Sequence, residues 1–591
     1  MKLKISYLIL FTLIVNIFSA NATIRFVSKT GTSTPPYTSW QTAADSIQKC
    51  INICVDGDTV YVANGVYKET LLINTAISLI GSSMDSTVIS GESSTINRLV
   101  DFAQNGSIEN FYINGRGLYS AQDGIIGFHT DIIVKNCRIE NLDDAIVLFS
   151  STSLVEKCFI KNFIKRAIWD ECASNNCLGY YQNNLIISTS SSETPVLFSF
   201  GGYPTFNNNI VIEEVYRLTG VDVQYNSGAN ILNNLVSGYI YENIRIGQIN
   251  SDTAYVENNI SLNSPIAFST STGNRTKLLN NIAKDSFTGI ESPLSGTTIP
   301  DYNLFWNVQE LATGNVVLGD SNLVADPMFV IDTIPRVGGT YDYHLQAYSP
   351  AIDKGDPNIL DKDGTRSDIG MYGGPFGETY TYQDLAPLAP RNLSAVVDTN
   401  QILLKWNRST EADTSFYKVY RDTVVNFTID STKLVSSSAD TFFVQPNPHI
   451  NTRYAYKVTC VDNQGNESQP SQELVVNITS VSIDDYPMII SDYLLYQNYP
   501  NPFNPSTKIG YQLKERAYVK LIVYDIKGEL ITVLVNKEQN AGYYEVDFSV
   551  GSLQSTVGNS IASGIYLYRI EVIGEGSIPV YTEMKKMLLI K

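Results

Sequence analysis

A short unit of two polar residues followed by an apolar run recurs along the first half of the chain. From residue 111 to residue 303 its middle residue returns at steps of 26, 21, 26, 25, 25, 25, 22 and 22. The apolar runs are short and β-rich, as in Leu185-Ile186-Ile187 and Ile210-Val211-Ile212. A repeat of this length indicates a solenoid. The pattern therefore predicts an all-β fold class, a parallel β-helix with one coil per repeat.

Asparagine is the residue that marks the repeat. A tight turn between strands needs a residue that tolerates left-handed dihedral angles, and Asn does so better than other non-Gly residues. Stacked Asn side chains can also hydrogen-bond from coil to coil. We expect such an inward structural ladder, with Cys137 and Cys158 in the same column as small buried residues. Its predicted members are Asn184, Asn209, Asn234, Asn259, Asn281 and Asn303.

The N-terminal region carries two further signals. Residues 1–22 read as a signal peptide, with Lys2 and Lys4 before an apolar run and a small-residue cleavage site. Residues 39–54 place apolar side chains on one helical face, which predicts an amphipathic helix that caps the open end of the solenoid. We therefore expect a secreted protein, released or held at the outer cell surface.

Composition and charge narrow the possible partners. The 591 residues are 43% hydrophobic and carry a formal net charge of −18. Such an acidic chain argues against nucleic acid, and an anionic substrate would need a local basic patch or a bridging cation. The chain has seven cysteines without a C-x-x-C pair and only three histidines, which argues against a metal site. Either Cys50–Cys54 or Cys172–Cys177 can form a disulfide outside the cell.

The first coils, Gly57–Val62, Gly65–Glu69 and Ile77–Gly81, resemble the opening coils of the pectin-lyase-like, right-handed β-helix superfamily. The segments 322–329 and 349–355 resemble the closing part of secreted bacterial β-helix proteins. We place this domain at residues 23–378. Its closing part contains Asp361, Asp363 and Asp368, which suit either a structural turn or calcium. The spacing is not that of an EF-hand, which favours the turn, and no other cofactor is expected.

A proline-marked linker at 385–390 precedes a second β-domain. Alternating segments such as Leu403–Trp406 and Tyr454–Val458 predict strands. Residues 386–478 resemble a fibronectin type III sandwich, with Trp406 as a core residue and Tyr454 as the tyrosine corner.

The last hundred residues contain Tyr499–Pro505, Val523–Gly528, Ser563–Tyr568 and the terminal Lys585–Lys591. Together these resemble the type A C-terminal sorting domain of the Bacteroidetes type IX secretion system, here residues 493–591. The resemblance implies that the outer-membrane export machinery of that system is a partner of this domain. An ordinary terminal β-domain is the alternative.

The register of the repeat also indicates candidate catalytic residues. Arg98, Asp123, Asp144 and Arg166 follow one another at steps of 25, 21 and 22 and are expected to form one column. Two carboxylates on adjacent coils lie roughly 4.8 Å apart, so their pKa values can split for acid–base catalysis. We take Asp123, Asp144 and Arg166 as candidate catalytic residues, facing outward in a groove. Neighbouring candidates are His129, Asp143, Lys165 and Asp170.

Two alternatives compete with catalysis at this column. Alternating charges on a solvated sheet face offset like-charge repulsion without any activity. Binding without turnover is also open, with Trp169, Tyr180, Tyr181 and Tyr203 as stacking surfaces. Asp143-Asp144 resembles the Asp-Asp element of polygalacturonases, but their Gly-His-Gly and Arg-Ile-Lys elements do not occur. We therefore expect a β-helix protein that binds extracellular polysaccharide or acts in adhesion. A polysaccharide lyase or glycoside hydrolase is the alternative, and the sequence leaves enzymatic activity open.

Overall fold

The computed structural model divides the chain into two compact units, Met1–Leu385 and Ala386–Lys591. It describes residues 22–92, 95–118, 120–173, 176–215, 217–271, 275–293, 297–336, 338–398, 401–478, 492–498, 501, 503–525, 529–550, 564–574 and 579–589. The signal peptide at 1–22 lies outside this range except for its last residue. Among the described residues, none of the helices has the length and apolar character needed to cross a membrane.

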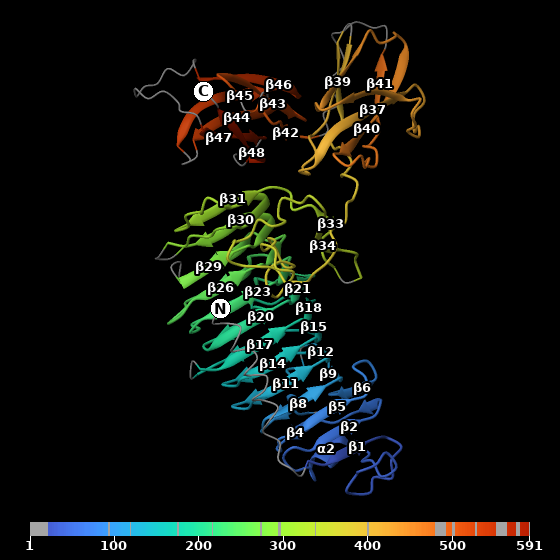
Figure 1. Ribbon diagram of the computed structural model, residues 1–591, viewed down its shortest axis with the longest axis vertical. Coiled ribbons are helices and arrows are strands. Elements are labelled where there is room, and N and C mark those ends of the chain that lie inside the picture. Colours follow the sequence, from blue (N-terminus) through green and yellow to red (C-terminus); the bar gives the residue numbers. More distant parts are fainter. Residues whose placement is uncertain are drawn as a thin grey trace. The chain divides into compact units, whose positions relative to one another are not determined.

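The first unit is a right-handed parallel β-helix, as the repeat predicts (Figure 1). One of its faces is an 11-stranded sheet to which each coil adds a parallel strand. Its strands are β1 (Ile24–Val27), β2 (Thr59–Val62), β5 (Ser78–Gly81), β8 (Gly106–Glu109), β11 (Ile132–Lys135), β14 (Ser153–Glu156), β17 (Leu178–Gln182), β20 (Tyr203–Asn207), β23 (Ala229–Leu232), β26 (Ala254–Glu257) and β29 (Thr276–Leu279).

The second face follows the Asn turn of each coil. Its strands are β3 (Gly65–Tyr67), β6 (Thr87–Ser90), β9 (Tyr112–Asn114), β12 (Arg138–Leu142), β15 (Phe159–Phe163), β18 (Leu185–Ser188), β21 (Ile210–Glu213), β24 (Leu235–Ser237), β27 (Ile260–Leu262) and the first parts of β30 (Ile282–Ser292) and β31 (Leu304–Gly314), closed by β32 (Leu323–Val324).

The third face completes each coil and shares the long strands β30 and β31 with the second. Its strands are β4 (Leu71–Ile73), β7 (Arg98–Phe102), β10 (Asp123–Phe128), β13 (Ile146–Phe149), β16 (Ile168–Glu171), β19 (Leu197–Phe200), β22 (Thr219–Gln224), β25 (Glu242–Ile246) and β28 (Ile266–Thr270).

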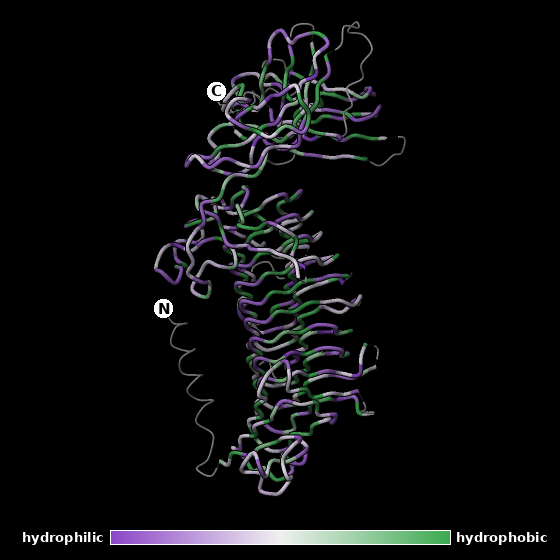
Figure 2. The backbone as a smooth tube through the Cα atoms, turned by 90° about the vertical axis from the view of Figure 1, so that its right-hand side faces the viewer, coloured by the Kyte–Doolittle hydropathy of each residue, from purple (hydrophilic) through white to green (hydrophobic). Residues whose placement is uncertain are grey.

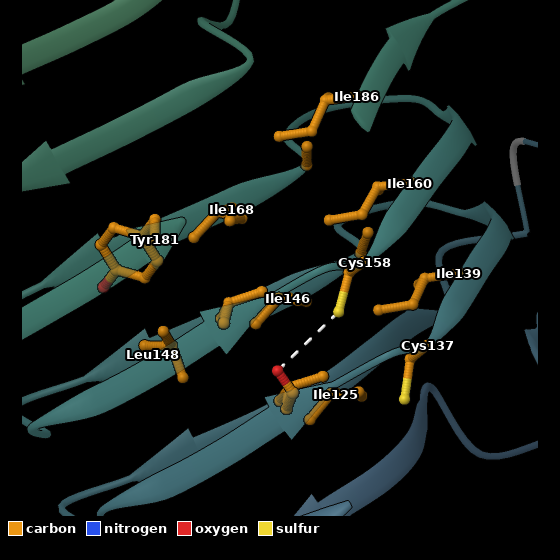
Figure 3. Packing of buried hydrophobic residues seen from close by; sticks show 14 of the residues in the cluster. Ile125, Cys137, Ile139, Ile146, Leu148, Cys158, Ile160, Ile168, Tyr181 and Ile186 are labelled. Atoms are coloured by element: carbon orange, nitrogen blue, oxygen red, sulfur yellow. Dashed lines mark hydrogen bonds between the residues drawn. The ribbon is translucent and has the colours of Figure 1, made fainter. Parts of the chain in front are cut away.

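The interior is built from stacked columns of like side chains. Equivalent residues of successive coils pair in register, so each apolar position meets its counterparts above and below. Figure 3 shows two such columns, Ile125–Ile146–Ile168 and Ile139–Ile160–Ile186, with Cys137 and Cys158 beside them. Figure 2 shows the resulting stack of coils. Repeated burial of this kind is what holds a solenoid together, because each coil contacts only its neighbours.

The N-terminal cap differs from the predicted helix over 39–54. Only α2 (Ile47–Ile51) is helical, with Ser46 as its N-cap residue. Glu69 accepts hydrogen bonds from the backbone N–H groups of Ile47 and Gln48, which fixes the start of the helix there. Ala44 is not helical because its backbone pairs with β1: its N–H donates to Phe26 O, and its C=O accepts from the N–H of Ser28, the residue after that strand. The prediction of a longer helix was wrong, although the short one still buries its apolar side.

The two residues of each Asn pair have different roles. The first, as in Asn183, Asn208 and Asn233, adopts a left-handed backbone with φ between 53° and 58°. The second points inward, and its side-chain oxygen accepts from both the backbone N–H and the side-chain amide of the preceding coil. These bonds are 2.9–3.1 Å long. They connect Asn184, Asn209, Asn234, Asn259, Asn281 and Asn303, and they continue to Asn322.

Parallel coiling ends at β32, before the predicted limit of residue 378. The remaining segment forms the antiparallel pair β33 (Phe329–Ile331) and β34 (Asp342–Leu345) and then returns along the Asn turns. Side-chain amides of Asn208, Asn233 and Asn258 donate to backbone carbonyls within residues 368–376. We call residues 325–378 the closing segment. Its apolar side chains cover the outer column of the second face, which includes Leu235, Ile260, Ile282 and Leu304.

The second unit contains two antiparallel sandwiches. The first has sheets β35–β36–β39 and β38–β37–β40–β41. Its strands are β35 (Ser394–Asp398), β36 (Gln401–Lys405), β37 (Thr414–Asp422), β38 (Leu434–Ser438), β39 (Phe442–Pro446), β40 (Thr452–Asp462) and β41 (Leu474–Ile478). Trp406 is buried in its core, and the Tyr454 hydroxyl accepts from the backbone N–H of His449, as a tyrosine corner does.

The second sandwich has sheets β42–β43–β46 and β45–β44–β47–β48. Its strands are β42 (Leu494–Leu495), β43 (Ser506–Leu513), β44 (Ala517–Asp525), β45 (Leu530–Gln539), β46 (Gly542–Ser549), β47 (Gly564–Ile573) and β48 (Pro579–Leu589). Phe503 of the predicted sorting motif packs in its core. Other motif residues (499, 500, 502, 526–528, 563, 590 and 591) lie outside the described part of the chain.

Candidate functional site

The outer surface of the third face, across strands β7 to β25, gathers the charged residues that repeat register predicts. Asp123 of β10 pairs with Arg98 of β7. Ile125 pairs with Ile146, which in turn pairs with Ile168, so the residues two positions earlier continue the same column. We call this outer surface the charged face. The structure therefore brings together Arg98, Asp123, Asp144 and Arg166.

Three carboxylates cluster where β10 meets the turn before β13. Oxygens of Asp123, Asp143 and Asp144 all lie within 4.8 Å of one another. The backbone N–H of Asp144 donates to Asp123 Oδ1 at 3.2 Å. Burial raises the pKa of Asp144 to about 6 and also raises the pKa of Asp123, because both carboxylates lose water.

Cations beside this cluster neutralise part of its charge. Lys165 Nζ lies 2.7 Å from Asp143 Oδ2, and an Arg166 guanidinium nitrogen lies 3.6 Å from Asp144 Oδ1. Arg98 turns away and pairs with Asp101 at 2.9 Å. Oxygen ligands suit calcium, but Lys165 and Arg166 already supply the compensating charge at two of these three carboxylates.

The catalytic hypothesis requires that the carboxylates of Asp123 and Asp144 face outward and are accessible to a ligand. That expectation is wrong for Asp144, which is 2% exposed and closed over by Arg166. Because the residue lies at the turn into β13, its side chain packs under the guanidinium instead of projecting from the sheet. The pairing pattern matches the charge ladder that we gave as an alternative.

Several predicted neighbours lie elsewhere. Asp170 points into the β-helix, where Ser199 donates to it at 3.1 Å. Tyr180, Tyr181 and Tyr203 belong to β17 and β20 of the first face, and Tyr181 is fully buried. His129 lies just past the end of β10 and is exposed.

Aromatic side chains accompany the charges on this face. The Arg166 guanidinium lies 4.1 Å from the ring centroid of Trp169 and 5.3 Å from that of Phe198. Phe149 contacts Trp169 edge to face, with centroids 5.0 Å apart, and stacks on Phe128 at 4.8 Å. A separate pair, Phe200 and Tyr225, follows on later coils with centroids 5.2 Å apart.

A second charged group on later coils was missed at the sequence level. Arg245 of β25 pairs in register with Asp222 of β22 and lies 3.9 Å from its carboxylate and 3.6 Å from that of Glu242. Burial raises the pKa of Asp222 to about 6. The signal was present, because Trp169, Phe198, Asp222 and Arg245 follow at steps of 29, 24 and 23 residues and share one column.

Comparison with known proteins gives structural likenesses only. No family model matches the chain, and no curated protein matches it. Among solved structures, pectate lyase Pel9A is 14% identical and covers 60% of this chain and 97% of its own, with a TM-score of 0.42. XylC in complex with xylose is 10% identical, covers 52% and 88%, and has a TM-score of 0.33.

A third match covers a smaller part of the chain. An Fn3-like protein from Clostridium thermocellum is 27% identical and covers 16% of this chain and 98% of its own, with a TM-score of 0.14 over the whole chain. With TM-scores below 0.5, none of these matches assigns a function to the chain.

The closing-segment carboxylates that were considered as calcium ligands have a structural role in the fold. Asp361 accepts from the backbone N–H groups of Asp368 and Gly374, while Asp363 accepts from Thr365 within its own turn. Asp368 accepts from the backbone N–H of Asp353 at 2.9 Å. Each carboxylate therefore ties down backbone, as a structural turn requires.

Proposed function

We propose that the protein is an extracellular β-helix protein that binds polysaccharide on the charged face. The observation that carries this proposal is the group formed by Arg166, Trp169 and Phe198, in which the guanidinium lies 4.1 and 5.3 Å from the two aromatic ring centroids. Aromatic rings offer a large apolar surface to the C–H side of a sugar ring. A guanidinium group makes directional hydrogen bonds to its hydroxyl oxygens.

The repeat places similar side chains one after another along the axis of the β-helix. Adjacent coils lie roughly 4.8 Å apart, so equivalent side chains recur at short, regular intervals. Phe128 and Phe200 lie on different coils, 37% and 38% exposed. Exposed aromatic side chains grouped on one face mark interaction surfaces of soluble proteins. A chain of sugars running along the axis would meet several of these side chains.

A glycan array with purified protein tests this proposal. We expect binding to at least one polysaccharide and a weaker signal from Trp169→Ala at unchanged melting temperature. Phe442→Ala is a matched control, because Phe442 is a 43% exposed aromatic residue of the second unit. Failure to bind any polysaccharide, or equal binding by Trp169→Ala, would contradict the proposal.

We also propose that the type IX secretion machinery exports the protein through residues 493–591. The proposal is supported by the resemblance of that region to type A sorting domains and by the apolar N-terminal run. Deletion from residue 493 onward is expected to leave the protein in the periplasm of a type IX-competent host, with the β-helix folded. Normal appearance of the truncated protein outside the cell would refute the assignment.

One observation keeps hydrolysis or lyase chemistry as the second candidate. The pKa of Asp144, raised to about 6, suits a proton donor near neutral pH, and burial also raises the pKa of the neighbouring Asp123. A screen for new reducing ends and unsaturated products tests this possibility. If the pair is catalytic, Asp144→Asn abolishes turnover of an identified glycan while binding persists. Absence of any product across the glycans that bind would remove this candidate.

A further inference from the structure

We propose that the ligand of the charged face is an uncharged polysaccharide and not a polyuronate or another polyanion. This rests on the polysaccharide-binding function proposed above.

Cations of the face are held by carboxylates of the same face. Arg98 pairs with Asp101 at 2.9 Å and Lys165 with Asp143 at 2.7 Å. Arg166 and Arg245 each lie within 4 Å of carboxylate oxygens as well. A polyanion would have to displace these carboxylates from the cations. The carboxylates are attached to the same face, so they lose little entropy when they pair. The cations are therefore poor partners for an incoming carboxylate.

Carboxylates also outnumber the cations on this face. Against Arg98, Lys165, Arg166 and Arg245 stand Asp101, Asp123, Asp143, Asp144, Glu171, Asp222 and Glu242. The whole chain carries a formal charge of −18, so long-range attraction also opposes an anionic polymer. Like charges brought together at an interface cost affinity and suppress wrong partners.

The same groups suit hydroxyl-rich, uncharged sugars. A carboxylate accepts hydrogen bonds from a hydroxyl, and a guanidinium donates them. Trp169 and Phe198, which are neighbours in register, supply apolar surface beside Arg166.

The test compares two ligand classes on the purified protein. Xylan, mannan, β-1,3-glucan and cello-oligosaccharides represent uncharged glycans, and polygalacturonate and alginate represent polyuronates. Affinity is measured at low and high NaCl, with Ca²⁺ and with a chelator. We expect binding to an uncharged glycan whose Kd changes little with salt, because no ion pairs form with the ligand.

Two variants locate the contact. Trp169→Ala and Phe200→Ala should each weaken binding by about 2- to 12-fold, the range expected for one aromatic contact. Phe442→Ala should leave it unchanged. Phe200 is exposed, so its variant remains informative if Trp169→Ala fails to fold. Binding of an uncharged glycan that neither face variant alters would place the contact elsewhere and overturn the assignment to this face.

The remaining outcomes separate this inference from the function on which it rests. Binding of polyuronates alone, with or without Ca²⁺, would overturn the uncharged class and leave polysaccharide binding standing. A requirement for Ca²⁺ would point to a cation bridging the Asp123, Asp143 and Asp144 cluster to the polymer. Binding of neither class would overturn both.

Discussion

Replacing Asn259 by Ala should destabilise the β-helix far more than replacing an exposed Asn on a neighbouring coil. The Asn259 side chain is fully buried and lies in the middle of the ladder. Its oxygen accepts from the backbone N–H and side-chain amide of Asn234 at 2.9 and 3.0 Å. Its amide donates to Ile231 O, Glu257 O and Asn281 Oδ1.

The Ala variant leaves the backbone N–H of Asn234 without an acceptor in a dry interior, whereas the Asn234 side-chain amide keeps its bonds to Phe206 O and Leu232 O. A buried donor left without a partner costs about 1–3 kcal/mol, so we expect a loss of about 1–3 kcal/mol. Asn281 Oδ1 keeps the backbone N–H of residue 259 and adds little to this cost. Asn250→Ala, on an exposed turn, should stay within about 0.5 kcal/mol of the wild type.

Urea unfolding of residues 23–385, followed by far-ultraviolet circular dichroism, measures the difference. That segment is a compact unit by itself, so its transition is not mixed with those of the sandwiches. A loss below about 1 kcal/mol for Asn259→Ala, or equal losses for the two variants, would refute the view that ladder hydrogen bonds hold adjacent coils together.

Three further predictions follow from other buried polar groups. Burial raises the pKa of Asp170 to about 7, so the stability of the wild-type protein falls as pH rises from about 4 to about 7. Asp170→Asn should therefore raise the melting temperature at pH 8 and not at pH 4. An equal gain at both pH values would contradict this. Asn233→Gly keeps the left-handed turn but removes the bonds to Met371 and Gly373; hydrogen exchange should accelerate in 368–376 and not in β23. Asp58→Asn breaks the buried pair with Arg25; a loss of about 3–5 kcal/mol in urea unfolding is expected, and an unchanged midpoint would count against it.

The period of the Asn pairs predicted the β-helix because one residue type serves two needs at the same place. Asn183 and its equivalents need a left-handed backbone, and Asn184 and its equivalents need a buried side chain with both donor and acceptor. Few other residues meet either requirement. The sequence could not show that the first Asn of several pairs also binds the closing segment, since those contacts join residues more than a hundred positions apart.

Register predicted which residues share a column but not how far each side chain reaches from the sheet. Asp144 lies in the expected column, yet it is buried under Arg166 because the turn before β13 turns it inward. The aromatic residues were placed less well. Tyr180 and Tyr181 follow the Cys172–Cys177 disulfide turn, which returns the chain to the first face. A residue count through that turn does not reveal the change of face.

Two faces of the β-helix carry outward apolar side chains, which are covered on one face and exposed on the other. On the second face, Leu235 and Leu304 are buried because Phe329 and other residues of the closing segment cover them. On the third face, Phe128 and Phe200 remain more than a third exposed beside ionised groups. Apolar surface left exposed in this way carries a cost in solubility unless it recognises something. Since the cations beside it are already paired with carboxylates, the ligand that best fits this surface brings hydroxyl groups and an apolar ring face, without charge.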